Sequence, residues 1–219
     1  LTIDNEYLKV ALDEDGNIIS IFSKVLNKEM IKEKANFFIY NDSGGDCWDI
    51  YQRYYLEDKK NLILQDCSIY RELDKAGYVL KYSYNNSVLT INLYLKNKKN
   101  GLFFDCSFEN NMFEEMLRFD ISPSFDADKA AFNLQYGHIY RSTKDDNHIE
   151  KAKFEVCGHK FIDYANDDYG FALINDSKYG FRVKNGLVSM NLMRSQNTPC
   201  KNQDIGSHKF SFEIYRSEE

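Results

Sequence analysis

Carboxylates, a histidine and aromatic rings are concentrated between residues 159 and 181, in the stretch HKFIDYANDDYGFALINDSKYGF. Two carboxylates at a tuned distance could perform acid–base chemistry of the kind that cleaves a glycosidic bond. Asp167 and Asp168 are adjacent, however, and adjacent side chains of an extended chain point to opposite faces. Asn, Asp and Ser also form Asx-type turns. We therefore interpret residues 166–168 and 175–177 as turns that flank a strand over residues 171–174.

A second group of candidate side chains lies in the loop that begins at residue 41 with NDSGG, where Trp48 stands between Asp46 and Asp49. Trp48 is the single tryptophan of the sequence. Its indole could stack on a sugar ring while the neighbouring carboxylates accept hydrogen bonds from sugar hydroxyls. Alternatively, Trp48 anchors the loop in the core.

Arg194 ends a predicted strand over residues 187–194. Strict alternation places its side chain on the same side as Val188, Met190 and Leu192, over an otherwise apolar face. From there it could hold an oxygen atom of a substrate or form a structural ion pair.

The four histidines, at positions 138, 148, 159 and 208, follow none of the known metal-ligand spacings. We predict no metal site within this chain. No GxSxG motif or activated-cysteine context is present, although a catalytic triad assembled from distant residues stays open.

Alternation with a period of two residues dominates the chain and predicts the elements that must position these side chains. Leu8, Val10 and Leu12 alternate with other residues before a turn at residues 13–17, which is typical of a β-hairpin. Residues 89–95 and 210–214 follow the same pattern. Helical signals are limited to a turn or two within residues 24–34 and 111–116, and residues 140–150 read as a connection. The pattern predicts an all-β fold, a large antiparallel β-sandwich.

Composition and charge limit the classes of partner that the chain is expected to bind. The 219 residues are 43% hydrophobic with a net charge of -6, so we expect neither nucleic acid nor a membrane surface as a partner. Five cysteines without a CxxC pair, and no leader or long apolar run, favour a reducing, cytoplasmic location. We expect one domain over residues 1–219. The chain begins with Leu1 rather than Met, as a C-terminal piece of a longer polypeptide would.

Short motifs occur in a defined order along the chain: DCWDI at residues 46–50, QYG at 135–137, AKFEV at 152–156, YG at 169–170, NDSKYG at 175–180, LMRS at 192–195 and DIGSHKF at 204–210. Together they resemble the C-terminal β-domain of family 38 glycoside hydrolases, the zinc-dependent α-mannosidases, in their bacterial branch. The resemblance covers essentially all of this chain but only the last part of the family's enzymes. Residues 142–148 depart from the family pattern, so no role is carried over to them.

The resemblance implies a sandwich of the galactose-mutarotase type with no catalytic residue and no zinc ligand in this segment. The nucleophile, the acid/base and the zinc would belong to an upstream catalytic domain of the same chain, which hydrolyses α-mannosides with retention. The β-domain would support that domain and lend residues to the rim of the pocket for a mannose-containing glycan. The rim candidates are Asp46, Trp48, Asp49 and Arg194. A homo-oligomer is left open.

Two other functions stay open at the level of sequence. A free-standing sugar epimerase of the mutarotase type would need His159 or His138 opposite Glu155 or Glu213. A plain carbohydrate-binding or structural sandwich needs no catalytic pair.

Overall fold

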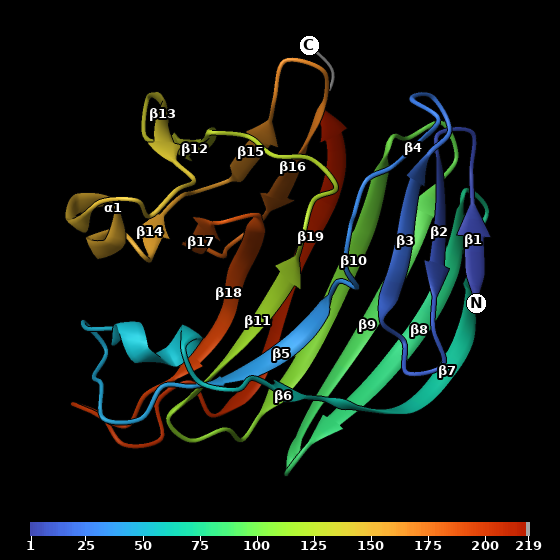
Figure 1. The fold of residues 1–219 in the computed structure, drawn as a ribbon. Coiled ribbons are helices and arrows are strands. Elements are labelled where there is room, and N and C mark those ends of the chain that lie inside the picture. The colour runs from blue at the N-terminus through green and yellow to red at the C-terminus, as the bar shows by residue number, and fades with distance from the viewer. Residues whose placement is uncertain (218–219) are drawn as a thin grey trace.

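A computed structural model describes residues 1–217, the side chain of Ser217 excepted, as three antiparallel sheets (Figure 1). The largest has nine strands in the order β13 (Gly137–Ser142), β12 (Lys129–Leu134), β15 (Phe161–Ala165), β16 (Gly170–Asn175), β19 (Gly206–Ser217), β10 (Gly101–Asn110), β9 (Ser87–Lys96), β8 (Lys75–Tyr84) and β7 (Ile63–Arg71).

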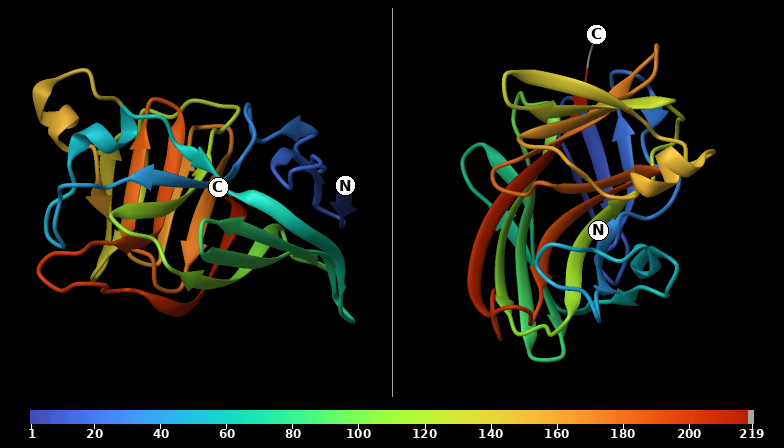
Figure 2. Two further views of the ribbon diagram at one scale, coloured as in Figure 1. Left: turned by 90° about the horizontal axis from the view of Figure 1, so that it is seen from below. Right: turned by 90° about the vertical axis from the view of Figure 1, so that its left-hand side faces the viewer.

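The second sheet has six strands in the order β14 (Val156–Cys157), β17 (Gly180–Lys184), β18 (Leu187–Ser195), β11 (Glu115–Ile121), β5 (Asn36–Asn41) and β6 (Lys60–Asn61). The third comprises β1 (Thr2–Asp4), β2 (Leu8–Leu12), β3 (Ile18–Ser23) and β4 (Lys28–Glu29). Figure 2 shows the nine-stranded sheet curving around the six-stranded one. The predicted antiparallel β-sandwich is therefore confirmed.

Side chains from the two large sheets meet in one core. Phe104 of β10 stacks on Phe212 of β19 with ring centres 4.3 Å apart, and Phe37 and Phe119 of the six-stranded sheet pack against this pair. Each fully buried phenylalanine contributes roughly 1.5–3 kcal/mol to stability. The alternating residues predicted to face one way in β9 and β19 are all buried: Leu89, Ile91, Leu93, Leu95, Phe210, Phe212 and Ile214.

The predicted hairpin near the N-terminus is confirmed as β2 and β3. Asp13 closes the turn, because its Oδ1 accepts hydrogen bonds from the backbone N–H groups of Asp15 and Asn17. Gly16 has φ +78°, a conformation that other residues rarely adopt.

Residues 159–181 form strands joined by turns, as predicted. Asn166 Oδ1 accepts hydrogen bonds from the N–H groups of Asp168 and Tyr169, and Asn175 Oδ1 accepts one from Lys178. These two Asx turns flank β16, which confirms the predicted strand. The conspicuous carboxylates therefore mark turns between strands.

The helical predictions were wrong in position. Residues 24–34 contain β4, and β11 begins at Glu115 directly after a loop. Within residues 1–217 the helices are instead the 3₁₀ turn η1 (Gln52–Tyr55) and α1 (His148–Ala152), which Asn147 caps through its side chain. The sequence did not predict α1, because a helix this short contains too few apolar residues to show a helical periodicity after its cap. Neither helix is long and apolar enough to cross a membrane.

Candidate functional site

The loop between β5 and η1 carries three of the four predicted rim residues, Asp46, Trp48 and Asp49, and projects from one end of the six-stranded sheet (Figure 1). Trp48 is 73% exposed, and Tyr51 and Leu56 close by are 49% and 75% exposed. The alternative that Trp48 anchors the loop in the core is therefore wrong. Aromatic side chains are enriched at contact surfaces, so the exposed indole is a candidate for such a contact.

Asp46 shapes the tip of this loop rather than pointing freely outward. Its Oδ1 accepts hydrogen bonds from the backbone N–H groups of Trp48 and Asp49, both at 2.8 Å. This Asx turn keeps the indole and the Asp49 carboxylate at the loop surface. Asp46, Trp48 and Asp49 are thus brought together, as their spacing suggested.

Arg194 lies on the face opposite to the one that alternation predicted. The pairing of β18 with β11 shifts by one residue, because Met193 pairs with Leu117 whereas Asn191 pairs with Arg118. Leu192 is the extra residue of this bulge. Arg194 therefore pairs with Met116, away from the core between the sheets. A bulge re-aims every side chain that follows it.

The Arg194 guanidinium holds the loop in place. Its Nε lies 2.5 Å from Oδ2 of Asp42, whose side chain is 2% exposed, and its Nη2 donates to the Asp49 carbonyl. Of the two roles considered for Arg194, the structural ion pair is the one formed. Gln196 adds a hydrogen bond from Nε2 to the Asp42 carbonyl at 2.7 Å.

The other side of the loop is held by the segment after β18. The Cys47 backbone N–H donates to the Thr198 carbonyl at 3.1 Å, and Gln203 donates to the Cys47 sulfur. The rim candidates therefore rest on two supports. Asp42, Gln196 and Gln203 were missed at the sequence level, since nothing local marks a partner some 150 positions away.

The sequence of the chain matches that of a known protein family. Residues 3–202 match the model of the glycosyl hydrolases family 38 C-terminal domain. The chain belongs to this family. The resemblance seen in the sequence is thereby confirmed.

The relatives of this family 38 domain are much longer than the domain itself. It is 30% identical to "Alpha-mannosidase G" of Dictyostelium discoideum and 28% identical to "Alpha-mannosidase" of Saccharomyces cerevisiae. Each alignment covers 98% of this chain but only 21% and 22% of the relative. The crystal structure of an α-mannosidase from Enterococcus faecalis V583 superposes with a TM-score of 0.83 at 13% identity, over 99% of this chain and 29% of that one. This likeness shows the shared fold.

The family 38 domain also buries an ion pair beneath η1, on the same face of the six-stranded sheet as Arg194. Arg118 is fully buried, and its Nη2 lies 2.9 Å from Oε1 of Glu155, which also accepts a hydrogen bond from the Tyr54 hydroxyl. Burial opposes the charge of Arg118, but Glu155 and the other nearby groups outweigh it and raise its pKa. The pair thus fixes η1, which directly follows the Trp48 loop, to the sheet.

Asp120 forms the other half of this buried network. Its carboxylate accepts hydrogen bonds from Tyr40 at 2.6 Å, Lys59 at 2.7 Å and Ser189 at 2.6 Å, and Ser189 accepts one from Arg118. Burial, followed by the Asp120 charge, raises the pKa of Tyr40 far above its usual range. Asp120 thus accepts from three donors and Oε1 of Glu155 from two, which indicates a structural role for the network.

The histidines of the domain do not form the catalytic pairs that an epimerase would need. The His159 ring packs against Tyr179 at 5.3 Å, and His138 packs against Tyr140 at 5.2 Å. Within residues 1–217, no hydrogen bond or ion pair joins a histidine to Glu155 or Glu213. Residues 1–217 also contain no group of three or more His, Cys, Asp or Glu side chains that could hold a metal ion.

Proposed function

We propose that the chain is the C-terminal β-domain of a longer, retaining, zinc-dependent α-mannosidase, which hydrolyses α-mannosides in glycans. The observation that carries this proposal is the alignment of nearly the whole chain with about a fifth of each α-mannosidase relative. The partner of this domain is the catalytic domain that precedes it in the longer polypeptide. A cytoplasmic location belongs to the same proposal.

The loop after β5 supplies the rim of the sugar pocket. The exposed Trp48 indole offers an apolar face for a sugar ring, and the Asp49 carboxylate beside it accepts hydrogen bonds from hydroxyls. Arg194 and Asp46 position these two groups through their hydrogen bonds to the loop. Such support lowers the entropy lost on binding, because the loop is already ordered.

Zinc and the catalytic carboxylates belong outside this chain. The metal, when bound by the upstream domain, would hold sugar hydroxyls. What this chain's own residues do is narrower: they orient the sugar at the rim and shield it from water.

Substrate preference of the full-length polypeptide tests the proposal. We expect hydrolysis of a chromogenic α-mannoside and little hydrolysis of the matching β-mannoside or α-glucoside. A preference for either of the latter would contradict it. NMR spectroscopy shows which anomer of mannose is released first. We expect the α-anomer, because the proposed enzyme retains the configuration, and initial release of the β-anomer would contradict retention alone.

A further inference from the structure

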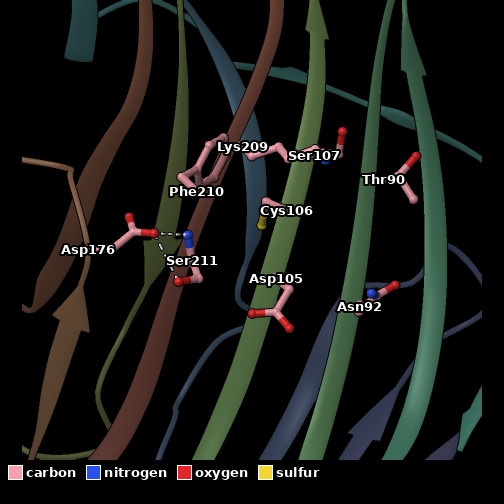
Figure 3. A pocket seen from close by; sticks show the side chains of 9 residues that line it. All are labelled: Thr90, Asn92, Asp105, Cys106, Ser107, Asp176, Lys209, Phe210 and Ser211. Atoms are coloured by element: carbon pink, nitrogen blue, oxygen red, sulfur yellow. Dashed lines mark hydrogen bonds between the residues drawn. The ribbon is translucent and has the colours of Figure 1, made fainter.

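The outer face of the nine-stranded sheet, turned away from the six-stranded sheet, carries an open hollow of 430 Å³. Figure 3 shows its lining: Asn92 comes from β9, Asp105 from β10 and Ser211 from β19, while Asp176 reaches in from the turn after β16. Oδ2 of Asp176 accepts hydrogen bonds from the Ser211 backbone and hydroxyl at 2.9 and 3.0 Å. The loop that carries Trp48 belongs to the other sheet.

A second hollow of 340 Å³ continues the first, since both are lined by Asp105, Asp176 and Ser211. Two aromatic rings border it, the half-buried Phe103 and the buried Tyr94, nearly parallel at 11° with centres 5.5 Å apart. We call the two hollows together the outer groove. Its volume is in the range of sites that bind small ligands.

Strand register explains why polar and aromatic side chains are sorted in the outer groove. Asn92, Asp105 and Ser211 pair across β9, β10 and β19 and form one row. Tyr94, Phe103 and Glu213 pair across the same strands and form the next row. Residues two positions apart share a face and lie about 6.8 Å from each other. A row of hydrogen-bonding groups thus runs alongside a row that begins with two aromatic rings.

The charges of the outer groove favour a neutral ligand. Asp105, Asp176 and Glu213 carry negative charge, and Lys96 and Lys209 carry positive charge, so neither an anionic nor a cationic polymer is favoured. The Nζ of Lys96 lies 4.4 Å from the centre of the Phe103 ring. Burial raises the pKa of Glu213, and the nearby charges of Lys96 and Lys99 oppose this shift only in part. Carboxylates, an amide and a hydroxyl beside the Phe103 ring match the hydroxyls and apolar faces of sugars.

We propose that the outer groove binds a neutral oligosaccharide. The half-buried Phe103 ring packs against a sugar ring, with the buried Tyr94 ring supporting it from beneath. Asp105 and Glu213 accept hydrogen bonds from hydroxyls, and Lys96 donates one. The groove would hold a glycan on the domain independently of hydrolysis. The ligand class is argued from the groove itself, whereas a preference for mannose would rest on the proposed function.

Chemical-shift changes in ¹⁵N-labelled residues 1–219, titrated separately with an α-linked mannotetraose and with maltotetraose, test the proposal. We expect shifts in β9, β10 and β19 with at least one of the two sugars. Asp105→Asn and Glu213→Gln keep the side-chain shape and should each weaken binding about ten-fold, because each removes a charge-assisted hydrogen bond. Glu109→Gln, on the same strand and face but outside the groove, is the matched control and should bind normally.

The proposal would be overturned by no shifts with either sugar, by shifts confined to residues 46–50, or by equal binding of the wild type and both groove variants. Binding by the isolated chain that vanishes in the full-length polypeptide would also overturn it, since a protein segment would then cover this face. Binding of maltotetraose alone would support the groove while arguing against mannose specificity. Absence of α-mannosidase activity would leave the binding result standing.

Discussion

Arg194 reaches back 152 positions to Asp42, with its Nε 2.5 Å from Oδ2 of a carboxylate that is 2% exposed. Because the same guanidinium donates to the Asp49 carbonyl, the pair couples the end of β18 to the loop that carries Trp48. The geometry of the candidate rim therefore depends on this buried charge pair.

Arg194→Ala leaves the Asp42 carboxylate buried without its cation, so the free energy of unfolding should fall by about 3 kcal/mol. Urea denaturation of residues 1–219 measures this. Arg194→Lys should recover part of the loss, since it restores the charge but not the paired donors. Lys201→Ala, at an exposed site of the neighbouring loop, is the control. Additive effects of Arg194→Ala and Asp42→Asn in a double-mutant cycle would argue against the coupling.

Trp48→Ala should change the free energy of unfolding by less than about 0.5 kcal/mol, because its side chain is 73% exposed. In the full-length polypeptide the same substitution should lower kcat/KM for an α-mannoside. Leu56→Ala, which removes a similarly exposed side chain nearby, should leave kcat/KM unchanged. Equal kinetics for the wild type and the Trp48 variant would remove Trp48 from the rim.

Trp48 also provides a direct optical readout, since it is the single tryptophan. We expect its emission in residues 1–219 to resemble that of indole in water and to be quenched readily by iodide. A blue-shifted emission that iodide does not quench would show a buried indole and contradict the loop conformation described above.

Glu155→Gln removes the carboxylate that faces the fully buried Arg118 guanidinium and should cost about 3 kcal/mol or more of stability. Because η1 is fixed through Tyr54 and Glu155, limited proteolysis within residues 51–58 should become faster than in the wild type. Asp58→Asn, at an exposed carboxylate next to η1, is the control. Unchanged proteolysis in the Glu155 variant would contradict this role of the network.

Burial raises the pKa of Glu213 above its ordinary value of 4.5, so the folded state binds a proton that the unfolded chain releases more readily. Stability contributed by this group is therefore present at pH values below 4.5 and is lost as the pH rises through the higher pKa of the folded state. Glu213→Gln should become more stable relative to the wild type across that window. Urea denaturation at a series of pH values checks this, and a difference that does not vary with pH would contradict it.

Local patterns predicted much of the fold. Alternation identified the buried positions of β9 and β19, because side chains of an extended chain point to opposite faces in turn. Asn166 and Asn175 identified their turns, since an Asx turn is closed by residues next to it in sequence.

The candidate site was less predictable. Alternation failed at Arg194, because the bulge at Leu192 is set by pairing with β11 and not by residues near it. The Arg118–Glu155 pair and the outer groove depend on strand order in the same way. The sequence identified Trp48 as a candidate sugar-binding residue. Its exposure could not be predicted, because the loop that carries it is held by distant residues such as Arg194.

The most direct test of the central claim compares hydrolysis of a chromogenic α-mannoside by residues 1–219 and by the full-length polypeptide, each before and after exhaustive chelation. We predict turnover by the full-length polypeptide, its loss on chelation with recovery on adding zinc, and no turnover by residues 1–219 in either condition. Turnover by residues 1–219 that survives chelation would contradict the account.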